Sequence, residues 1–272
     1  MKLAFSNLAW SSADDAAVAA LLASEAVHGV ELAPSKVWPG APQVDAGVAE
    51  GYTTWWRDAG CEIVAFQAIL FGRQELTLFG DASAVTSLER HLAAMGALAS
   101  RCGARVLVLG APGNRIRGPR SMPAAIAEAA RVLRPVAEAL APHGVSLCIE
   151  PNPPRYGCDF VTTAAEAAAL CDAVAHPNFG VHLDTAALAL SGEITEAALA
   201  PVTPHVRHVH LSEVDLAPVG STATVPHAHI GAALRAVGYA GWLSVEMRLS
   251  EHDEWRAALH RAAETARTHY LD

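Results

Sequence analysis

The sequence has 272 residues, enough for one large domain or two small ones, and its 52% apolar and 17% charged residues exclude a disordered chain. The net charge of −9 argues against a nucleic-acid-binding protein, which normally presents a basic face. No apolar run reaches the roughly 18 residues of a membrane-spanning helix, and Met1–Ser6 is too short and too soon polar for a signal peptide. The five cysteines contain no C-x-x-C pair, which predicts reduced thiols in a cytoplasmic protein rather than a zinc ribbon or a disulfide framework.

Short β-branched runs alternate with longer runs rich in Ala, Leu, Glu and Arg, a pattern typical of β-α units and a parallel sheet. Eight strands are predicted at Leu3–Ser6, Gly29–Ala33, Ile63–Ala68, Arg105–Leu109, Ser146–Glu150, Gly180–Asp184, Val206–Leu211 and Leu243–Met247. Helices are predicted from a Ser11–Asp14 cap to about Val27, then at about Ala84–Cys102, Pro123–Pro142, Ala164–Val174, Ile230–Val237 and His252–Tyr270, with one more short helix between Leu190 and Pro204. Four glycines stand between a helical run and a strand, where a left-handed residue ends the helix: Gly60, Gly103, Gly144 and Gly238.

Eight β-α units in this length predict a (β/α)8 TIM barrel that spans residues 1–272 as a single domain. An open doubly wound sheet with a dinucleotide site would need G-x-G-x-x-G after the first strand. The residues there are Asn7-Leu8-Ala9-Trp10, and no linker or long-period repeat divides the chain. The barrel is therefore the preferred architecture.

The last four predicted strands carry acidic or imidazole side chains at their carboxyl ends, where such barrels build their active sites. These residues are Glu150, Asp184, His210 and Glu246. Three carboxylates buried side by side would repel one another, and a divalent cation would remove that cost. Three oxygen donors and one nitrogen donor suit Mn²⁺, Mg²⁺ or Co²⁺ better than Zn²⁺. The alternative is that each is a strand-end polar residue bonded to a helix N-terminus.

Four segments resemble the xylose-isomerase-like barrel superfamily, and the resemblance covers essentially the whole chain: Cys148–Asn152, His182–Thr185, His208–Glu213 and Gly241–Glu246. That superfamily includes ketose 3-epimerases, hydroxypyruvate isomerase, inosose dehydratase and metal-dependent apurinic endonucleases. The resemblance implies that Glu150, Asp184, His210 and Glu246 hold one divalent ion, with Mn²⁺ expected and Mg²⁺, Co²⁺ or Zn²⁺ as alternatives. It also implies that Glu150 and Glu246 are an acid–base pair that isomerises or epimerises a sugar through a metal-stabilised enediolate.

The sequence departs from the epimerase pattern at two places. Ala187 stands where those enzymes usually carry a histidine, and Val214–Pro218 lacks their arginine. Epimerisation of a free ketose is therefore not carried over. A lyase of the inosose- or dehydroshikimate-dehydratase type and a catalytically silent binding barrel stay as alternatives. A three-zinc endonuclease is disfavoured despite His182, His227 and His229, because the chain is acidic and lacks a matching His–Asp layout on the third strand.

Further residues near the strand ends are candidates for substrate contact: Asn152, Gln67, His182, His229, Trp10, Tyr156 and Arg115. Trp10 and Tyr156 would offer aromatic faces to a sugar ring, with loop packing as the alternative. Arg115 belongs to a loop with three arginines, which is either a solvated rim or a site for phosphate or carboxylate. In the latter case the substrate is anionic. Glu31 is expected to be paired inside the barrel, and His227 to decorate its rim.

His182 precedes Asp184 by two residues and so points the same way along its strand, and His208 has the same relation to His210. Each is either a residue of the site or a core histidine with its hydrogen bonds satisfied. The partner implied by the whole set is a small sugar-like molecule, with no nucleic-acid or membrane partner. Barrels of this size often form homo-oligomers, and the sequence shows no interface that decides the matter.

Overall fold

The protein is described by a computed structural model that covers residues 1–250 and 254–271. Eight parallel strands close into a barrel in chain order, and β8 returns to pair with β1 at Leu243 and Leu3. The strands are β1 Lys2–Ser6, β2 Gly29–Leu32, β3 Glu62–Phe66, β4 Val106–Leu109, β5 Ser146–Ile149, β6 Phe179–Asp184, β7 Val206–Ser212 and β8 Trp242–Glu246. The predicted (β/α)8 barrel is confirmed, with each predicted strand end within two residues of the observed one.

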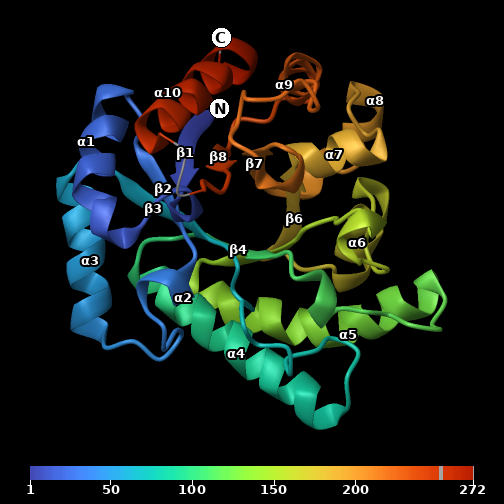
Figure 1. The fold of residues 1–272 in the computed structure, drawn as a ribbon. Coiled ribbons are helices and arrows are strands. Elements are labelled where there is room, and N and C mark those ends of the chain that lie inside the picture. Colours follow the sequence, from blue (N-terminus) through green and yellow to red (C-terminus); the bar gives the residue numbers. More distant parts are fainter. Residues whose placement is uncertain (251–253, 272) are drawn as a thin grey trace.

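The helices surround the strands as an outer layer (Figure 1). They are α1 Asp15–Ser24, α2 Pro34–Val37, α3 Ala46–Asp58, α4 Ala82–Arg101, α5 Met122–Leu140, α6 Ala164–Val174, α7 Thr185–Ser191, α8 Glu196–Leu199, α9 His227–Ala236 and α10 Trp255–Ala266. Short 3₁₀ turns lie at Asn7–Ala9, Ser12–Asp14, Pro112–Asn114, Ala141–His143, Pro154–Tyr156, Thr203–His205 and Val214–Leu216, and one π turn follows α10 at Arg267–Leu271. No helix in the described ranges is long and apolar enough to cross a membrane.

Most predicted helices are present, and the four glycines before β3, β4, β5 and β8 all have positive φ. The predicted helix His252–Tyr270 starts outside the described residues, and α10 is observed from Trp255. The sequence does not predict helix α3. Its two glycines and two threonines lower its helix propensity. Its stability comes from packing instead, since Ala49 and Trp56 are fully buried.

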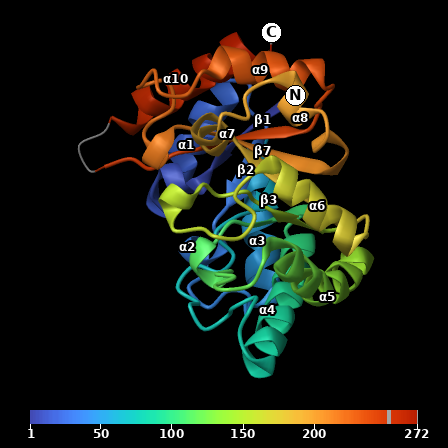
Figure 2. The ribbon, with the colours of Figure 1, turned by 90° about the vertical axis from the view of Figure 1, so that its right-hand side faces the viewer.

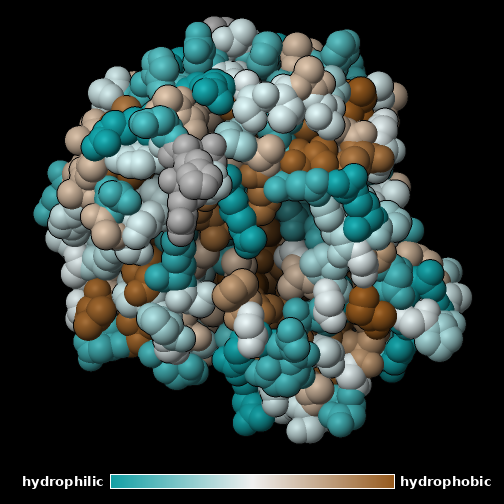
Figure 3. All heavy atoms as spheres, viewed as in Figure 1, coloured by the Kyte–Doolittle hydropathy of each residue, from teal (hydrophilic) through white to brown (hydrophobic). Residues whose placement is uncertain are grey.

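The strands are apolar almost throughout because both of their faces are buried. Helices cover the outer face, and side chains from the other strands pack against the inner face. Because all eight strands are parallel, the polar side chains at their carboxyl ends lie at the same end of the barrel. Figure 2 shows the segment between β5 and α6 projecting on the left, while α5 and α6 lie to the right. Figure 3 shows a hollow near the centre of the face viewed in Figure 1, with apolar residues visible inside it. This end of the barrel holds the candidate site.

Candidate active site

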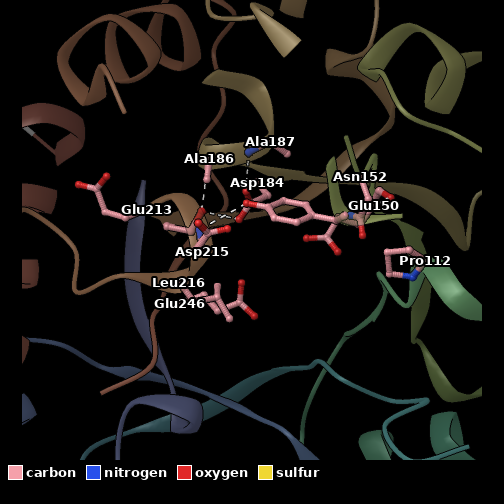
Figure 4. A pocket seen from close by; sticks show the side chains of 12 residues that line it. Pro112, Glu150, Asn152, Asp184, Ala186, Ala187, Glu213, Asp215, Leu216 and Glu246 are labelled. Atoms are coloured by element: carbon pink, nitrogen blue, oxygen red, sulfur yellow. Dashed lines mark hydrogen bonds between the residues drawn. The ribbon is translucent and has the colours of Figure 1, made fainter. Parts of the chain in front are cut away.

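The predicted metal ligands converge at the carboxyl ends of β5 to β8. Ligand atoms of Glu150, Asp184 and His210 lie within 4.8 Å of one another. Oε2 of Glu246 lies 3.2 Å from Nδ1 of His210, which adds the fourth residue to the group. Figure 4 shows Glu150, Asp184 and Glu246 around one cavity, with the Glu213 carboxylate directed away from them. Barrel closure has thus brought together four side chains that are far apart in the sequence.

Asp184 ends β6 and also caps helix α7. Its Oδ1 accepts a hydrogen bond from the backbone N–H of Ala187 at 2.7 Å, and its Oδ2 accepts one from Oγ of Ser212 at 2.5 Å. Ser212 is fixed in turn by Thr185, whose Oγ1 accepts from the Ser212 backbone N–H at 2.8 Å. The capping reading of Asp184 is therefore correct, and it is compatible with a ligand role because a carboxylate has further lone pairs to offer.

His210, on β7, is oriented by the buried carboxylate of Glu31 on β2, and β8 and β1 lie between these two strands in the closed barrel. Its Nε2 lies 2.9 Å from Oε2 of Glu31, which confirms that Glu31 is paired inside the barrel, and the same oxygen is 3.3 Å from Nε2 of His208. The Nδ1 atom of His210 is buried, has no hydrogen-bond partner, and faces Glu246. A carboxylate on one ring nitrogen with the other left free is the arrangement that positions a histidine to bind a metal.

Burial and mutual repulsion destabilise the charged carboxylates in the protein without an ion. Burial, together with the neighbouring charges of Asp184 and Glu246, raises the pKa of Glu150 to about 7, against an opposing effect of His210. Burial and the charge of Glu246 likewise raise the pKa of Asp184. A divalent cation would compensate these charges. The donor set and the unpartnered Nδ1 of His210 therefore fit a divalent metal ion.

The pKa values of His210 and Glu31 shift in the direction opposite to the effect of burial. Burial alone would lower the pKa of His210, but the carboxylates of Glu31 and Glu246 raise it well above its usual value. Burial alone would raise the pKa of Glu31, but His210 and His208 hold it well below its usual value. Glu31 is therefore an ionised anchor for the histidine pair.

Glu150 sits in a space that only glycine leaves free. A Cβ added at Gly110, just after β4, would lie 2.2 Å from Oε2 of Glu150. The backbone carbonyl of Glu150 accepts a hydrogen bond from Nη2 of Arg115 at 2.6 Å. The absence of a side chain at Gly110 thus allows the carboxylate its position, and Arg115 fixes the backbone that carries it.

The carboxylates line a cavity with two lobes, which we call the first lobe and the second lobe. The first, of about 470 Å³, includes Tyr156, Asp184, Ala187 and Asp215 in its wall. The second, of about 520 Å³, includes Gln67, Ile69, Phe71 and Arg248. The residues shared by both lobes are Pro112, Glu150, Asn152, Leu216 and Glu246. The two candidate acid–base glutamates therefore lie where the lobes meet.

Three of the predicted substrate contacts line this cavity. Asn152 borders both lobes, Tyr156 borders the first, and Gln67 borders the second. Tyr156 is 37% exposed, so its ring is available to a ligand. The amide of Gln67 donates to Ser6 Oγ, which fixes its orientation at the end of β3.

The expectation for Arg115 requires correction. Its side chain is 1% exposed and donates to the backbone carbonyls of Gly110, Phe160, Val161 and Glu150. The guanidinium therefore joins the loops after β4 and β5, and is neither a solvated rim nor open to an anion. Backbone carbonyls, which no sequence motif reveals, are its partners.

Other predicted contacts lie outside the cavity walls. Trp10 is 5% exposed and its Nε1 donates to Oδ1 of Asp15 at 2.7 Å, as in the loop-packing alternative. His229 is exposed on α9, away from both lobes. His182 is fully buried, with Nε2 3.5 Å from Oε1 of Glu150, and borders neither lobe. His227 is buried rather than on the rim, because its ring lies between Glu213 and Tyr270.

The sequence reading missed residues of the β7–α9 loop and of the end of β8. Asp215 and Leu216 both have positive φ, and Leu216 projects between the two lobes. Asp215 pairs with Arg155 at 2.5 Å, which links this loop to the segment after β5. Arg248, two residues after Glu246, borders the second lobe. The sequence indicates its position only through the two-residue spacing from Glu246, because alternate residues of an extended segment point to the same side.

Residues 19–267 match the protein family described as xylose isomerase-like TIM barrel. The chain belongs to this family. Similar solved structures include a D-psicose 3-epimerase from Clostridium cellulolyticum H10, at 17% identity and a TM-score of 0.81, with 98% of each chain covered. No curated protein matches the sequence.

Two further barrels of known structure resemble this member of the xylose isomerase-like family. An L-ribulose 3-epimerase has a TM-score of 0.78 at 20% identity, with 98% of this chain and 96% of the other covered. A 3-keto-D-glucoside 4-epimerase from E. coli has a TM-score of 0.72 at 18% identity, with 97% and 99% covered. At these identities the likeness establishes the shared barrel.

Proposed function

We propose that this protein is a divalent-metal-dependent isomerase or epimerase of a sugar or sugar derivative. The observation that carries the proposal is the position of Glu150 and Glu246, which border both lobes beside Asp184 and the unpartnered Nδ1 of His210. A binding protein has no need of two ionisable groups flanking one point in its cavity. An acid–base enzyme needs both, because one group removes a proton and another returns it.

Glu150, Asp184, His210 and Glu246 would hold the ion, and Mn²⁺ is the expected metal. When bound, the ion would act as a Lewis acid that polarises a substrate carbonyl and lowers the barrier to losing the adjacent proton. Glu150 and Glu246 would exchange that proton with the substrate carbon. Return to the same carbon gives an epimer, and return to the neighbouring carbon gives an isomer. Ser212 and Glu31 keep Asp184 and His210 in place during the exchange.

Substrate orientation would come from the cavity wall. Asn152 and Gln67 offer amide groups to sugar hydroxyls, and the Tyr156 ring offers an apolar face to the carbon skeleton. The structurally similar epimerases act on two ketoses and on a 3-keto-glucoside, which supports a sugar-like substrate. The five free cysteines are buried, in keeping with a cytoplasmic protein.

Deuterium exchange followed by NMR tests the proposal. The protein is stripped of metal, then restored with Mn²⁺, and incubated in D₂O with ketoses, keto-glucosides and inososes. We expect Mn²⁺-dependent deuterium incorporation that Glu150→Gln and Glu246→Gln each abolish. Glu62→Gln is the matched control, because Glu62 starts β3 at the opposite end of the barrel and is exposed.

The outcomes separate the alternatives. Exchange accompanied by loss of water would replace an isomerase with a lyase that uses the same ligands. Failure of the stripped protein to bind Mn²⁺ would refute the proposed metal centre. Sugar binding without exchange at any carbon would indicate a silent binding barrel.

A further inference from the structure

The two lobes of the cavity differ in charge. Beyond the residues that they share, the first lobe is bordered by the carboxylates of Asp184 and Asp215, of which Asp215 pairs with Arg155. Only the second lobe is bordered by the basic side chains of His210 and Arg248, beside the neutral side chains of Gln67 and Gln74. An anionic group is therefore repelled from the first lobe and attracted to the second. The asymmetry is notable in a chain whose net charge is −9.

Arg248 is held close to the reacting groups, and no residue in the described part of the chain pairs with its guanidinium. The backbone N–H of Arg248 donates to the Leu216 carbonyl at 2.9 Å, which fixes the segment after Glu246 against the β7–α9 loop. The residue is exposed, and within the described ranges no carboxylate forms an ion pair with it. Among residues 1–250 and 254–271, no side chain occupies the five N–H donors of its guanidinium, which borders the second lobe.

A second cation lies near Arg248. The ammonium group of Lys36 donates to the backbone carbonyls of Asn7 and Trp10, which hold it in place. Burial lowers the pKa of Lys36, and the charge of Arg248 lowers it further against the opposing effect of Asp15. Lys36 borders neither lobe, but its charge and that of Arg248 act on each other, so together they raise the positive potential around Arg248, and a bound anion would relieve it.

The cavity has room for a substrate of two parts. Each lobe, at about 470 Å³ and 520 Å³, by itself reaches the range of about 300–1,000 Å³ typical of a complete small-molecule site. Because Glu150 and Glu246 lie at the junction, reacting carbons placed there leave the second lobe for a substituent.

We propose that the substrate is a sugar that carries a carboxylate or phosphate group, and that Arg248 binds this group in the second lobe. The sugar carbons then lie between Glu150 and Glu246, with the remainder of the sugar in the first lobe. This inference rests on the proposed function, and it gives Arg248 the anion-binding role that the sequence had suggested for Arg115.

Isothermal titration of the Mn²⁺-loaded full chain tests the inference with three probes: D-fructose, D-fructose 6-phosphate and D-fructuronate. A charge-assisted contact predicts that at least one anionic probe binds about 10- to 100-fold more tightly than fructose. Whichever anion shows the preference identifies the substituent as phosphate or carboxylate. Arg248→Gln should abolish the preference, and Arg248→Lys should retain part of it because the charge remains.

Arg155→Gln is the matched control. It removes an exposed arginine on the same face that is already paired with Asp215, so the ratio of anionic to neutral affinity should stay as in the wild type. Raising the ionic strength from about 0.01 M to about 1 M shortens the Debye length from about 30 Å to about 3 Å and should weaken the preference.

Equal binding of all three probes by the wild type would overturn the inference, as would a loss of preference in Arg155→Gln as large as in Arg248→Gln. Deuterium exchange on neutral sugars without an anion preference would refute only the role of Arg248. An anion preference lost in Arg248→Gln, with no exchange on any sugar, would refute the proposed function and leave the anion site standing.

Discussion

Replacing Glu150 by glutamine probes the repulsion among the carboxylates directly. The amide has the shape of a protonated carboxyl group and carries no charge at any pH. In the metal-free wild type, burial and the charges of Asp184 and Glu246 make the ionised form of Glu150 unfavourable. The glutamine variant lacks this unfavourable state, so its stability relative to the wild type should depend on pH.

The size and sign of the effect follow from the pKa of Glu150, which rises from 4.5 in the unfolded chain to about 7 in the folded protein. That difference is worth about 3 kcal/mol, at 1.36 kcal/mol per pH unit. Between these two values the folded state binds more protons than the unfolded state, so stability falls as the pH rises. The stability that protonated Glu150 contributes is complete below about pH 4.5 and lost above about pH 7.

Thermal unfolding of both metal-free proteins between about pH 4.5 and pH 7.5 measures the effect. We expect similar melting temperatures at the acidic end and a glutamine variant that melts about 6–12 °C higher at the neutral end. Mn²⁺ should stabilise the wild type increasingly as the pH rises, because a carboxylate must lose its proton to bind metal. It should stabilise the variant much less.

The comparison between the two proteins cancels the contributions of shared groups that do not interact with Glu150, so the pH dependence of the difference reports on Glu150 together with Asp184, His210 and Glu246. A difference in melting temperature that stays constant across the pH range would refute the reasoning. It would mean that Glu150 is not destabilised when ionised, and that its carboxylate is not crowded by Asp184 and Glu246.

Three further substitutions test the supporting residues. Glu31→Gln should weaken Mn²⁺ binding by about 10- to 100-fold in a calorimetric titration, because it removes the carboxylate that orients His210; unchanged affinity would contradict this role. Gly110→Ala should leave the barrel folded by circular dichroism and weaken Mn²⁺ binding, since its Cβ would displace Glu150, whereas Gly113→Ala, with open space around it, should bind Mn²⁺ normally. Arg115→Met should lower the free energy of unfolding in urea by at least about 3 kcal/mol, because several buried carbonyls lose their donor; a change as small as that of the exposed Arg155→Met, within about 1 kcal/mol, would contradict it.

The sequence by itself determined the barrel and the strand-end residues that face its cavity. Short β-branched apolar runs such as Val106–Leu109 are typical of buried strands between helices, and glycines such as Gly103 mark where the helices end. Since parallel strands share a carboxyl end, Glu150, Asp184 and Glu246 had to meet once eight strands were recognised. These features can be read from the sequence because they depend on local patterns of apolar, glycine and strand-end polar residues.

Only the tertiary structure decided which of the remaining polar residues face the cavity. Glu31 and His210 are 179 positions apart, and their pairing follows from barrel closure. Arg115 and Arg248 both follow predicted strands, and the sequence does not show which of them is buried: the first is bound to backbone carbonyls, while the second borders the cavity. The path of a loop is set by the surfaces on which it packs, and those surfaces exist only once the strands have closed.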